Sequence, residues 1–296
     1  MHNQVTNIEL TLLGKVKAYI ELLKLRLSFL VAFSSGFGYV LGTDGILNVW
    51  NLILLSFGGM LVSGASVTIN QVIEVEFDAL MKRTKGRPLP TGRLSQMEAS
   101  IFAFIVAMVG LSILWISTNP LTVLLSIVSL ILYSFIYTPL KRVGPIAVFV
   151  GAIPGALPPL LGWVAATGGI SHEALIIFGI QFIWQFPHFW AIAWVGDEDY
   201  KKAGFKLLPN KGKKDLNTAI NIMVYTLFLL PLGLLPSYFG LTGLNSAVVA
   251  SLCACGFLAQ TFNLMRDHSD KVALKIMYGS FLYLPIVQIA YLLDKI

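Results

Sequence analysis

The chain of 296 residues is short of charge. Only 12% of its residues are Asp, Glu, Lys or Arg, while 56% are hydrophobic. Soluble domains carry roughly 25% charged residues, so this composition excludes an ordinary soluble domain. Apolar runs near the ~20 residues that cross a bilayer as a helix recur along the whole chain. The composition therefore predicts an all-α protein that crosses a membrane several times.

Cysteine is also scarce, with Cys253 and Cys255 in the apolar run "SLCACGFLAQ". Their spacing suits neither a zinc site nor a redox CxxC pair, so we interpret both as small packing residues. The first ten residues, "MHNQVTNIEL", contain no basic segment that leads into a short apolar one, and they are not rich in Arg. We therefore expect neither a cleaved signal peptide nor an organelle transit peptide.

The apolar runs predict nine membrane-spanning helices in one domain, 1–296, with residues 1–22 as an N-terminal cytoplasmic segment. The expected spans are 25–42, 50–77, 98–117, 121–138, 145–165, 174–196, 217–236, 244–265 and 273–292.

Basic residues are missing from every second loop. The segments "GTDGILNVW", "STNP", "ATGGISHE" and "SYFGLTGLN" contain no Lys or Arg, whereas the alternate loops are rich in both. The positive-inside rule then places the N-terminus in the cytoplasm and the C-terminus outside the cell (plasma) membrane. This asymmetry accounts for the net charge of +6 without a nucleic-acid partner.

An acidic cluster and a basic one follow each other in "NQVIEVEFDALMKRTKGRPLP", residues 70–90. Asn70, Glu74 and Asp78 are spaced four apart and share one helix face, while Glu76 points away. Carboxylates near a bilayer need a compensating charge. Mg²⁺ bound by these oxygens is one source, and a salt-bridge network with the bases that follow is the other. The spacing alone leaves both alternatives open.

Together these segments resemble the UbiA-type intramembrane prenyltransferases. Their first motif, NxxxDxxxD, is matched with Glu74 in place of the middle Asp. "WQFPHFWAIAWVGDEDYKKAGFKLLP", "YTPLKRVGPIAVFVGAIPGALPPLLGW" and "YIELLKLRLSFL" extend the similarity over nearly the whole chain. In the last of these, the family more often reads TKPR where this chain has residues 23–26, Leu-Lys-Leu-Arg. The WQFPHF stretch with DYKKAG is typical of the branch whose acceptor is haem.

The resemblance implies a helical bundle around a central cavity and an enzyme that transfers the farnesyl group of farnesyl diphosphate to a vinyl group of haem b, giving haem O. It implies Mg²⁺ as cofactor. Product hand-over to haem A synthase or to terminal oxidase assembly proteins is a further expectation. The implied metal ligands and catalytic residues are Asn70, Glu74, Asp78, Asp199 and Glu198, and the implied diphosphate-binding residues are Lys82, Arg83, Arg87, Tyr137, Lys141 and Arg142.

The second acidic cluster, Asp197, Glu198 and Asp199, departs from the family's usual second DxxxD. Ala203 lies four residues after Asp199 and Val195 four before it. Which of these acids binds metal is therefore open, and Asp199 is our first choice because it belongs to the matching DYKKAG segment.

His188, with Gln185 one turn earlier, is the implied haem-binding residue. An imidazole inside a membrane is expected to be functional, either as an axial ligand of haem iron or as an acid or base. The third interpretation is structural: Pro187 is expected to kink the helix, and His188 would then bond the carbonyl of Ile183 that Pro187 leaves free. The segment "GAIPGALPPLLGW" contains too much Gly and Pro for an uninterrupted helix, but its small residues permit close helix contacts.

Two rival functions remain on the sequence alone. One is a UbiA-type enzyme that prenylates a quinone or an aromatic precursor, which the missing second DxxxD and the presence of His188 disfavour. The other is a transporter whose acids are interfacial ion sites. Transporters favour ion sites near the bilayer midplane in broken helices, whereas these acids gather at a helix end.

Overall fold

The computed structural model describes residues 11–296 and contains, over that range, helices and a single isolated β-bridge. Residues 1–10, on which we expect no signal or transit peptide, lie outside the described residues. The helices are α1 Leu12–Leu22, α2 Leu25–Gly42, α3 Val49–Ile73, α4 Val75–Leu80, α5 Gln96–Ser117, α6 Pro120–Ile131, the π-helix η1 Leu132–Tyr137, α7 Thr138–Leu140, α8 Ile146–Thr167, α9 His172–Val195, α10 Asp197–Lys202, α11 Pro209–Gly212, α12 Leu216–Tyr238, α13 Leu244–Arg266 and α14 Asp270–Leu293.

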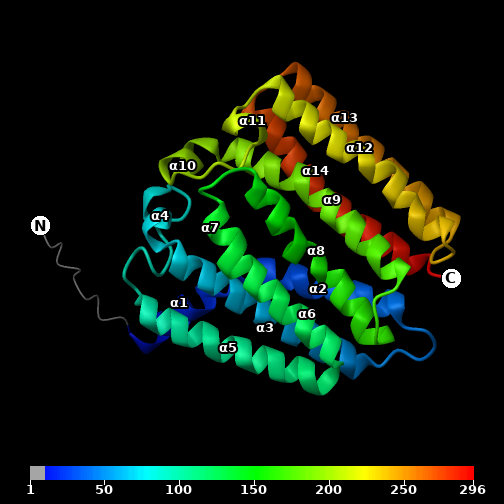
Figure 1. Cartoon of the computed structure of the whole chain (residues 1–296), viewed down its shortest axis with the longest axis horizontal. Coiled ribbons are helices and arrows are strands. Elements are labelled where there is room, and N and C mark those ends of the chain that lie inside the picture. The colour runs from blue at the N-terminus through cyan, green and yellow to red at the C-terminus, as the bar shows by residue number, and fades with distance from the viewer. Residues whose placement is uncertain (1–10) are drawn as a thin grey trace, which may run out of the picture.

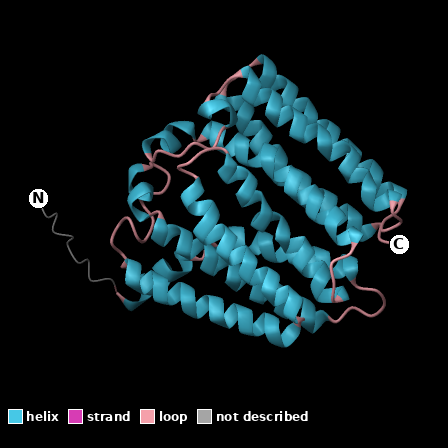
Figure 2. Cartoon of the chain, viewed as in Figure 1, coloured by secondary structure: helices cyan, strands magenta, loops and turns pink. Residues whose placement is uncertain are grey.

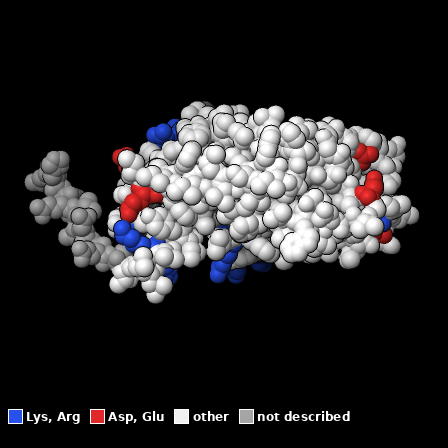
Figure 3. Space-filling view, turned by 90° about the horizontal axis from the view of Figure 1, so that it is seen from below, with Lys and Arg blue, Asp and Glu red and all other residues white. Residues whose placement is uncertain are grey.

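Within the described range, nine helical segments are long and apolar enough to cross a membrane, which confirms the predicted number. In Figure 3, Lys and Arg atoms lie mainly at the left end and in a group on the lower edge near the middle, Asp and Glu atoms lie at both ends, and most of the surface in view is uncharged. Capping residues mark the starts of α5 and α6, close to the predicted starts of these spans. Ser95 and Glu98 form a capping box at the start of α5, and Asn119 caps α6 just before Pro120. These caps satisfy backbone N–H groups that would otherwise be exposed at the helix ends.

The spans form a closed set of neighbours (Figures 1 and 2). On one side α3 packs against α2 and α5, and α6 packs against α8. On the other side α9, α12, α13 and α14 form a four-helix group, and α14 returns to α2. Helix α8 joins the halves through α2 and α9. In Figure 1 the short helices α1, α4, α7 and α10 lie at one end of the spans and the C-terminus lies at the other.

Helix α8 corrects one expectation, because "GAIPGALPPLLGW" forms part of a continuous helix of 22 residues that includes Pro154, Pro158 and Pro159. The expected close contacts are confirmed. A Cβ added at Gly162 would collide with the carbonyl oxygen of Ser35 in α2, and one added at Gly38 would collide with that of Pro159. Small residues on both helices therefore let the two backbones touch.

A buried polar cluster ties four spans together. Gln288 of α14 donates to Ser34 of α2 at 2.8 Å and to Gln181 of α9 at 3.0 Å. Gln181 in turn donates to the carbonyl of Gly155 in α8 at 2.8 Å. Because polar side chains in a bilayer have no water to bond, such a cluster fixes the register of α2, α8, α9 and α14.

The expectation that both cysteines are small packing residues is confirmed only for Cys253. Cys253 is half-buried, but Cys255 is exposed on α13, so it does not fill the core. Both are free thiols.

Candidate active site

Asn70, Glu74 and Asp78 lie on one face although the helix is broken at Glu74, between α3 and α4. The backbone N–H of Glu74 donates to the carbonyl of Asn70 at 3.0 Å, and that of Asp78 donates to Glu74 at 2.8 Å. Asn70, Glu74 and Asp78 are 3%, 4% and 1% exposed, whereas Glu76 is exposed, as the spacing predicts. The expected single helix 50–77 is corrected, because α3 ends at Ile73 and α4 begins at Val75.

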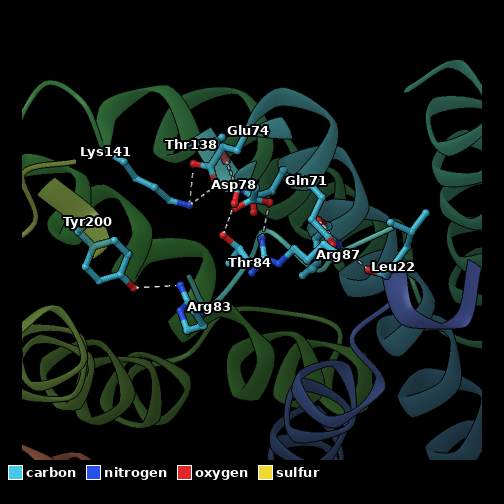
Figure 4. Close-up of polar contacts among 12 residues, drawn as sticks. Leu22, Gln71, Glu74, Asp78, Arg83, Thr84, Arg87, Thr138, Lys141 and Tyr200 are labelled. Carbon is cyan, nitrogen blue, oxygen red and sulfur yellow. Dashed lines mark hydrogen bonds and ion pairs between the residues drawn. The ribbon is translucent and has the colours of Figure 1, made fainter. Parts of the chain in front are cut away.

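Each buried acid has a basic partner (Figure 4). Lys141 directly follows α7, and its Nζ lies 2.9 Å from a Glu74 carboxylate oxygen. Arg87 Nη1 lies 2.5 Å from Asp78 Oδ2. The two ion pairs are nearly shielded from solvent, so without them the carboxylates would carry uncompensated charge in a medium of low dielectric constant. These ion pairs match the salt-bridge alternative that the spacing left open.

The site still has free oxygen atoms. Asp78 Oδ1 is buried and accepts no hydrogen bond. Asn70 donates to Thr138 Oγ1 through Nδ2 at 2.9 Å, which leaves its Oδ1 to accept or to ligate. Buried polar atoms without a partner are rare and need an explanation. Two carboxylates and an amide oxygen on one face match the donor set that Mg²⁺ prefers, so these residues fit a magnesium ion that shares substrate phosphate oxygens.

The second acidic cluster is placed differently. Asp197 is buried and bound to Lys201 at 2.7 Å, while Glu198 is exposed. Asp199 Oδ2 accepts from the Arg83 backbone N–H at 3.1 Å. Desolvation acts to raise the pKa of Asp199, but hydrogen bonds from the Arg83 amide and Lys202 outweigh it, and the pKa lies below its usual value. Asp199 thus anchors the basic loop to α10.

The structure does not assemble the expected set of acids into one group. Between residues 11 and 296, no cluster of three or more His, Cys, Asp or Glu side chains has the arrangement of a metal site. Glu74 and Asp78 lie together. Asp199 instead bonds the backbone of Arg83 in the loop after α4, and Glu198 faces solvent.

The expected diphosphate-binding residues form an inner and an outer set. Inside, Arg87 and Lys141 bind the acids, and Lys141 Nζ lies 4.8 Å from the ring centre of the buried Tyr137. The exposed outer set is Lys82, Arg83 and Arg142. Arg83 Nη2 lies 3.4 Å from the Tyr200 hydroxyl, and the Arg142 guanidinium stacks 4.8 Å over Phe77.

The two long loops pack on each other over this end of the bundle. Met81 of the first loop and Phe205 of the second share a small buried cluster with Ala203. The Lys206 N–H donates to the carbonyl of Lys141 at 2.9 Å. This hydrogen bond fixes the end of α7 and therefore the position of Lys141, whose side chain reaches Glu74.

His188 faces α14. Its Nδ1 lies 2.7 Å from Ser280 Oγ, and its ring stacks on Trp184 at 4.6 Å. Helix α9 runs on through Pro187, and the His188 ring bonds Ser280 rather than the carbonyl of Ile183.

Gln185 faces another helix. Its Nε2 donates to the carbonyl of Ala152 in α8 at 2.9 Å. Gln185 Nε2 and His188 Nδ1 therefore bond different neighbouring helices, α8 and α14.

Sequence reasoning missed three polar residues that hold this geometry. Thr138 bonds Asn70, Gln71 donates to the carbonyl of Leu22 at 2.8 Å, and Ser280 bonds His188. All three are buried polar side chains within an apolar run or at its end, which is the only signal that the sequence offers.

The comparisons with known proteins agree with this geometry. The profile of the UbiA prenyltransferase family matches residues 30–284. This chain belongs to the UbiA prenyltransferase family. A relative named protoheme IX farnesyltransferase, from Cytophaga hutchinsonii, is 53% identical over 283 residues, which cover 96% of this chain and 99% of that one. The recognised family, the helical fold and the class of enzyme are thereby confirmed.

Solved structures show the same UbiA-type fold. One of digeranylgeranylglyceryl phosphate synthase has a TM-score of 0.78 at 20% identity and covers 95% of this chain and 98% of that one. A UbiA homologue from Archaeoglobus fulgidus, bound to GPP and Mg²⁺, has a TM-score of 0.64 at 17% identity and covers 93% of this chain and 99% of that one.

Proposed function

We propose that this UbiA-family protein transfers the farnesyl group of farnesyl diphosphate to a vinyl group of haem b, giving haem O. The observation that carries the proposal is the buried face of Asn70, Glu74 and Asp78 at the mouth of the bundle, with Asp78 Oδ1 unpaired beside Arg87. The 53% identity to a protoheme IX farnesyltransferase supports haem as the acceptor over a quinone or an aromatic precursor. Residues 1–296 act as one prenyltransferase domain.

Glu74 and Asp78, with the side-chain oxygen of Asn70, would hold Mg²⁺, and a structural relative solved with GPP and Mg²⁺ bound supports this assignment. Bound there, it polarises the diphosphate and stabilises charge on the leaving group. Of the second acidic cluster, Asp199 is the best-placed further metal ligand, because its carboxylate accepts from the Arg83 amide in the loop that follows α4. Glu198 is the weakest candidate because it is exposed.

The ion pairs of the protein explain why acids and bases gather together. Glu74 with Lys141 and Asp78 with Arg87 are balanced pairs in a buried site. With Mg²⁺ and a diphosphate bound, the acids would hold the metal, and Arg87 and Lys141 would be free to bind the phosphate oxygens. Tyr137, beside Lys141, and the outer cations Lys82, Arg83 and Arg142 complete the phosphate-binding set. The site therefore remains close to neutral before and after binding.

The reaction then proceeds by ionisation. The allylic C–O bond breaks, and its electron pair leaves with the diphosphate, whose growing charge Arg87 and Lys141 stabilise. The vinyl π electrons of haem form a carbon–carbon bond to the farnesyl cation. Water adds to the cation left on the former vinyl carbon and loses a proton. The products are pyrophosphate, a proton and a hydroxyethylfarnesyl haem.

His188 is the haem ligand of this proposal. Ser280 Oγ donates its only hydrogen to the carbonyl of Met277 at 2.6 Å, so it must accept from His188 Nδ1–H. The other ring nitrogen, Nε2, then keeps its lone pair and is able to ligate iron. Gln185 contacts α8 and supports the position of α9 rather than haem.

We place the protein in the cell (plasma) membrane, with the α4 and α10 end in the cytoplasm and the C-terminus outside. The Lys and Arg asymmetry of the loops supports this orientation. Product hand-over to haem A synthase or to terminal oxidase assembly proteins is part of the same proposal. The transporter alternative has no support, because the acids lie at a helix end and the family is one of prenyltransferases.

A product assay tests the function. Purified protein is incubated with Mg²⁺, farnesyl diphosphate and either haem b or a quinone precursor, and prenylated products are identified by mass. We expect product from haem b only. Asp78→Asn should abolish it, whereas the exposed neighbour Glu76→Gln should retain it. Prenylation of the quinone precursor but not of haem b would overturn the proposal.

A further inference from the structure

Helices α13 and α14 border a polar cavity at one end of their contact. The cavity has a volume of about 490 Å³ and is lined by Gln260, Asn263, Arg266, Asp267, Val272 and Lys275. None of these residues belongs to the candidate active site. Lys214, which precedes α12, binds Asp270 of α14 at 2.7 Å, so the cavity lies at the end of the spans that carries the second long loop. Its volume is within the range of about 300–1,000 Å³ that small-molecule sites occupy.

The two cations of the cavity have no acidic partner in the described part of the chain. Arg266 ends α13 and Lys275 lies in the second turn of α14, and neither takes part in an ion pair there. Asp267, which also lines the cavity, accepts from the Ser269 N–H at 3.1 Å and from its hydroxyl at 3.0 Å. Two cations against one carboxylate give the cavity a net positive charge, which favours an anionic ligand.

The wall of the cavity also holds an unused acceptor. Gln260 Oε1 is buried and accepts no hydrogen bond from the described residues. Its carboxamide reaches α14, since a Cβ added at Gly279 would lie 2.3 Å from this oxygen. A buried acceptor without a donor is rare and needs an explanation, which a hydroxyl of a bound ligand would supply.

The seam between the two helices is apolar beyond the cavity. Gln260, Gly256 and Leu252 are spaced four apart and share one face of α13, and Lys275 and Leu282 share one face of α14. Gly256 is exposed with open space beside it, and Leu252 and Leu282 are 67% and 64% exposed. A surface that is basic at its aqueous end and apolar along the spans matches an amphiphile such as a phospholipid, whereas free phosphate would use only the basic end.

We propose that this cavity binds the headgroup of an anionic phospholipid from the adjoining leaflet, with the acyl chains along the apolar seam of α13 and α14. Arg266 and Lys275 bind the phosphate through charged hydrogen bonds. Gln260 Oε1 accepts from a headgroup hydroxyl, so phosphatidylglycerol is a suitable ligand. Basic pockets between membrane-spanning helices on the cytoplasmic side, where we place this end, are known to bind anionic headgroups.

A rival explanation is that Arg266 and Lys275 are solvated loop charges that only set the topology of the chain. Arg266→Gln with Lys275→Gln removes both cations of the cavity. Lys213→Gln with Lys271→Gln is the matched control, because it removes two exposed cations that do not line the cavity. Gln260→Met removes the acceptor but keeps the side-chain volume and the charge of the cavity.

The direct measurement is a native mass spectrometry titration of the delipidated full chain in detergent with phosphatidylglycerol or the zwitterionic phosphatidylcholine. We expect the wild type to prefer phosphatidylglycerol. Arg266→Gln with Lys275→Gln should weaken its binding about 30-fold, at about fivefold for each interfacial cation, while Tm without lipid stays unchanged. The control variant should stay within about twofold of the wild type, because its cations lie outside the cavity.

Phosphatidylmethanol adds a readout that charge alone would not move, because it carries the charge of phosphatidylglycerol but no headgroup hydroxyl. The wild type should bind phosphatidylglycerol about three- to tenfold more tightly than phosphatidylmethanol, and Gln260→Met should bind both equally. Equal phosphatidylglycerol affinity in Arg266→Gln with Lys275→Gln and in the wild type would overturn the inference, as would an equal loss in the control variant. Release of the bound lipid by millimolar inorganic phosphate would show an ion site and overturn the lipid assignment.

Discussion

The ion pair between Arg87 and Asp78 allows the sharpest test of the site. The Asp78 side chain is 1% exposed and that of Arg87 is 17% exposed, with 2.5 Å between Nη1 and Oδ2. Arg87→Met removes the cation, keeps most of the side-chain volume and leaves Asp78 buried without compensation. Breaking a buried pair in this way costs about 3–5 kcal/mol. At ~2–4 °C per kcal/mol for a chain of this size, Tm should fall by ~6–20 °C.

The double variant Asp78→Asn with Arg87→Met decides whether charge causes the loss. Because it removes both partners, its Tm should recover most of that difference, although its activity should remain absent. Lys15→Met is the matched control, since the Lys15–Glu98 pair has side-chain exposures of 46% and 36% and such surface pairs contribute only about 0–1 kcal/mol. Unfolding can be followed in detergent through the fluorescence of the six tryptophans. A Tm of Arg87→Met within about 2 °C of the wild type would refute the reasoning, since the pair would then contribute no more than a surface one.

Other predictions follow from the remaining contacts. Chelation with EDTA should abolish turnover and Mg²⁺ should restore it; full turnover in thoroughly chelated buffer would remove the metal from the mechanism. His188→Ala should shift or remove the Soret band of added haem and leave pyrophosphate binding unchanged, whereas Ser280→Ala should weaken haem binding by about 10- to 100-fold, as loss of a ligand-orienting partner does. An unaltered Soret band and haem affinity in His188→Ala would rule out iron ligation. Reporter fusions at Ile296 should report an external C-terminus, and a cytoplasmic signal there would contradict the nine-span topology.

The sequence by itself determined the class of protein, the number of spans and the face of Asn70, Glu74 and Asp78. Those features depend on hydrophobicity and on helical periodicity, which are local properties. Spacing also predicted correctly that Glu76 would be exposed. The motifs with Arg87 and His188 were visible for the same reason, because their residues lie within short segments.

Only the tertiary structure decided which groups meet. Lys141 is 67 residues from Glu74 in the sequence, and Ser280 is 92 residues from His188, so no local pattern could pair them. Long-range contacts depend on how whole helices pack, and the charges of neighbouring residues do not encode that packing.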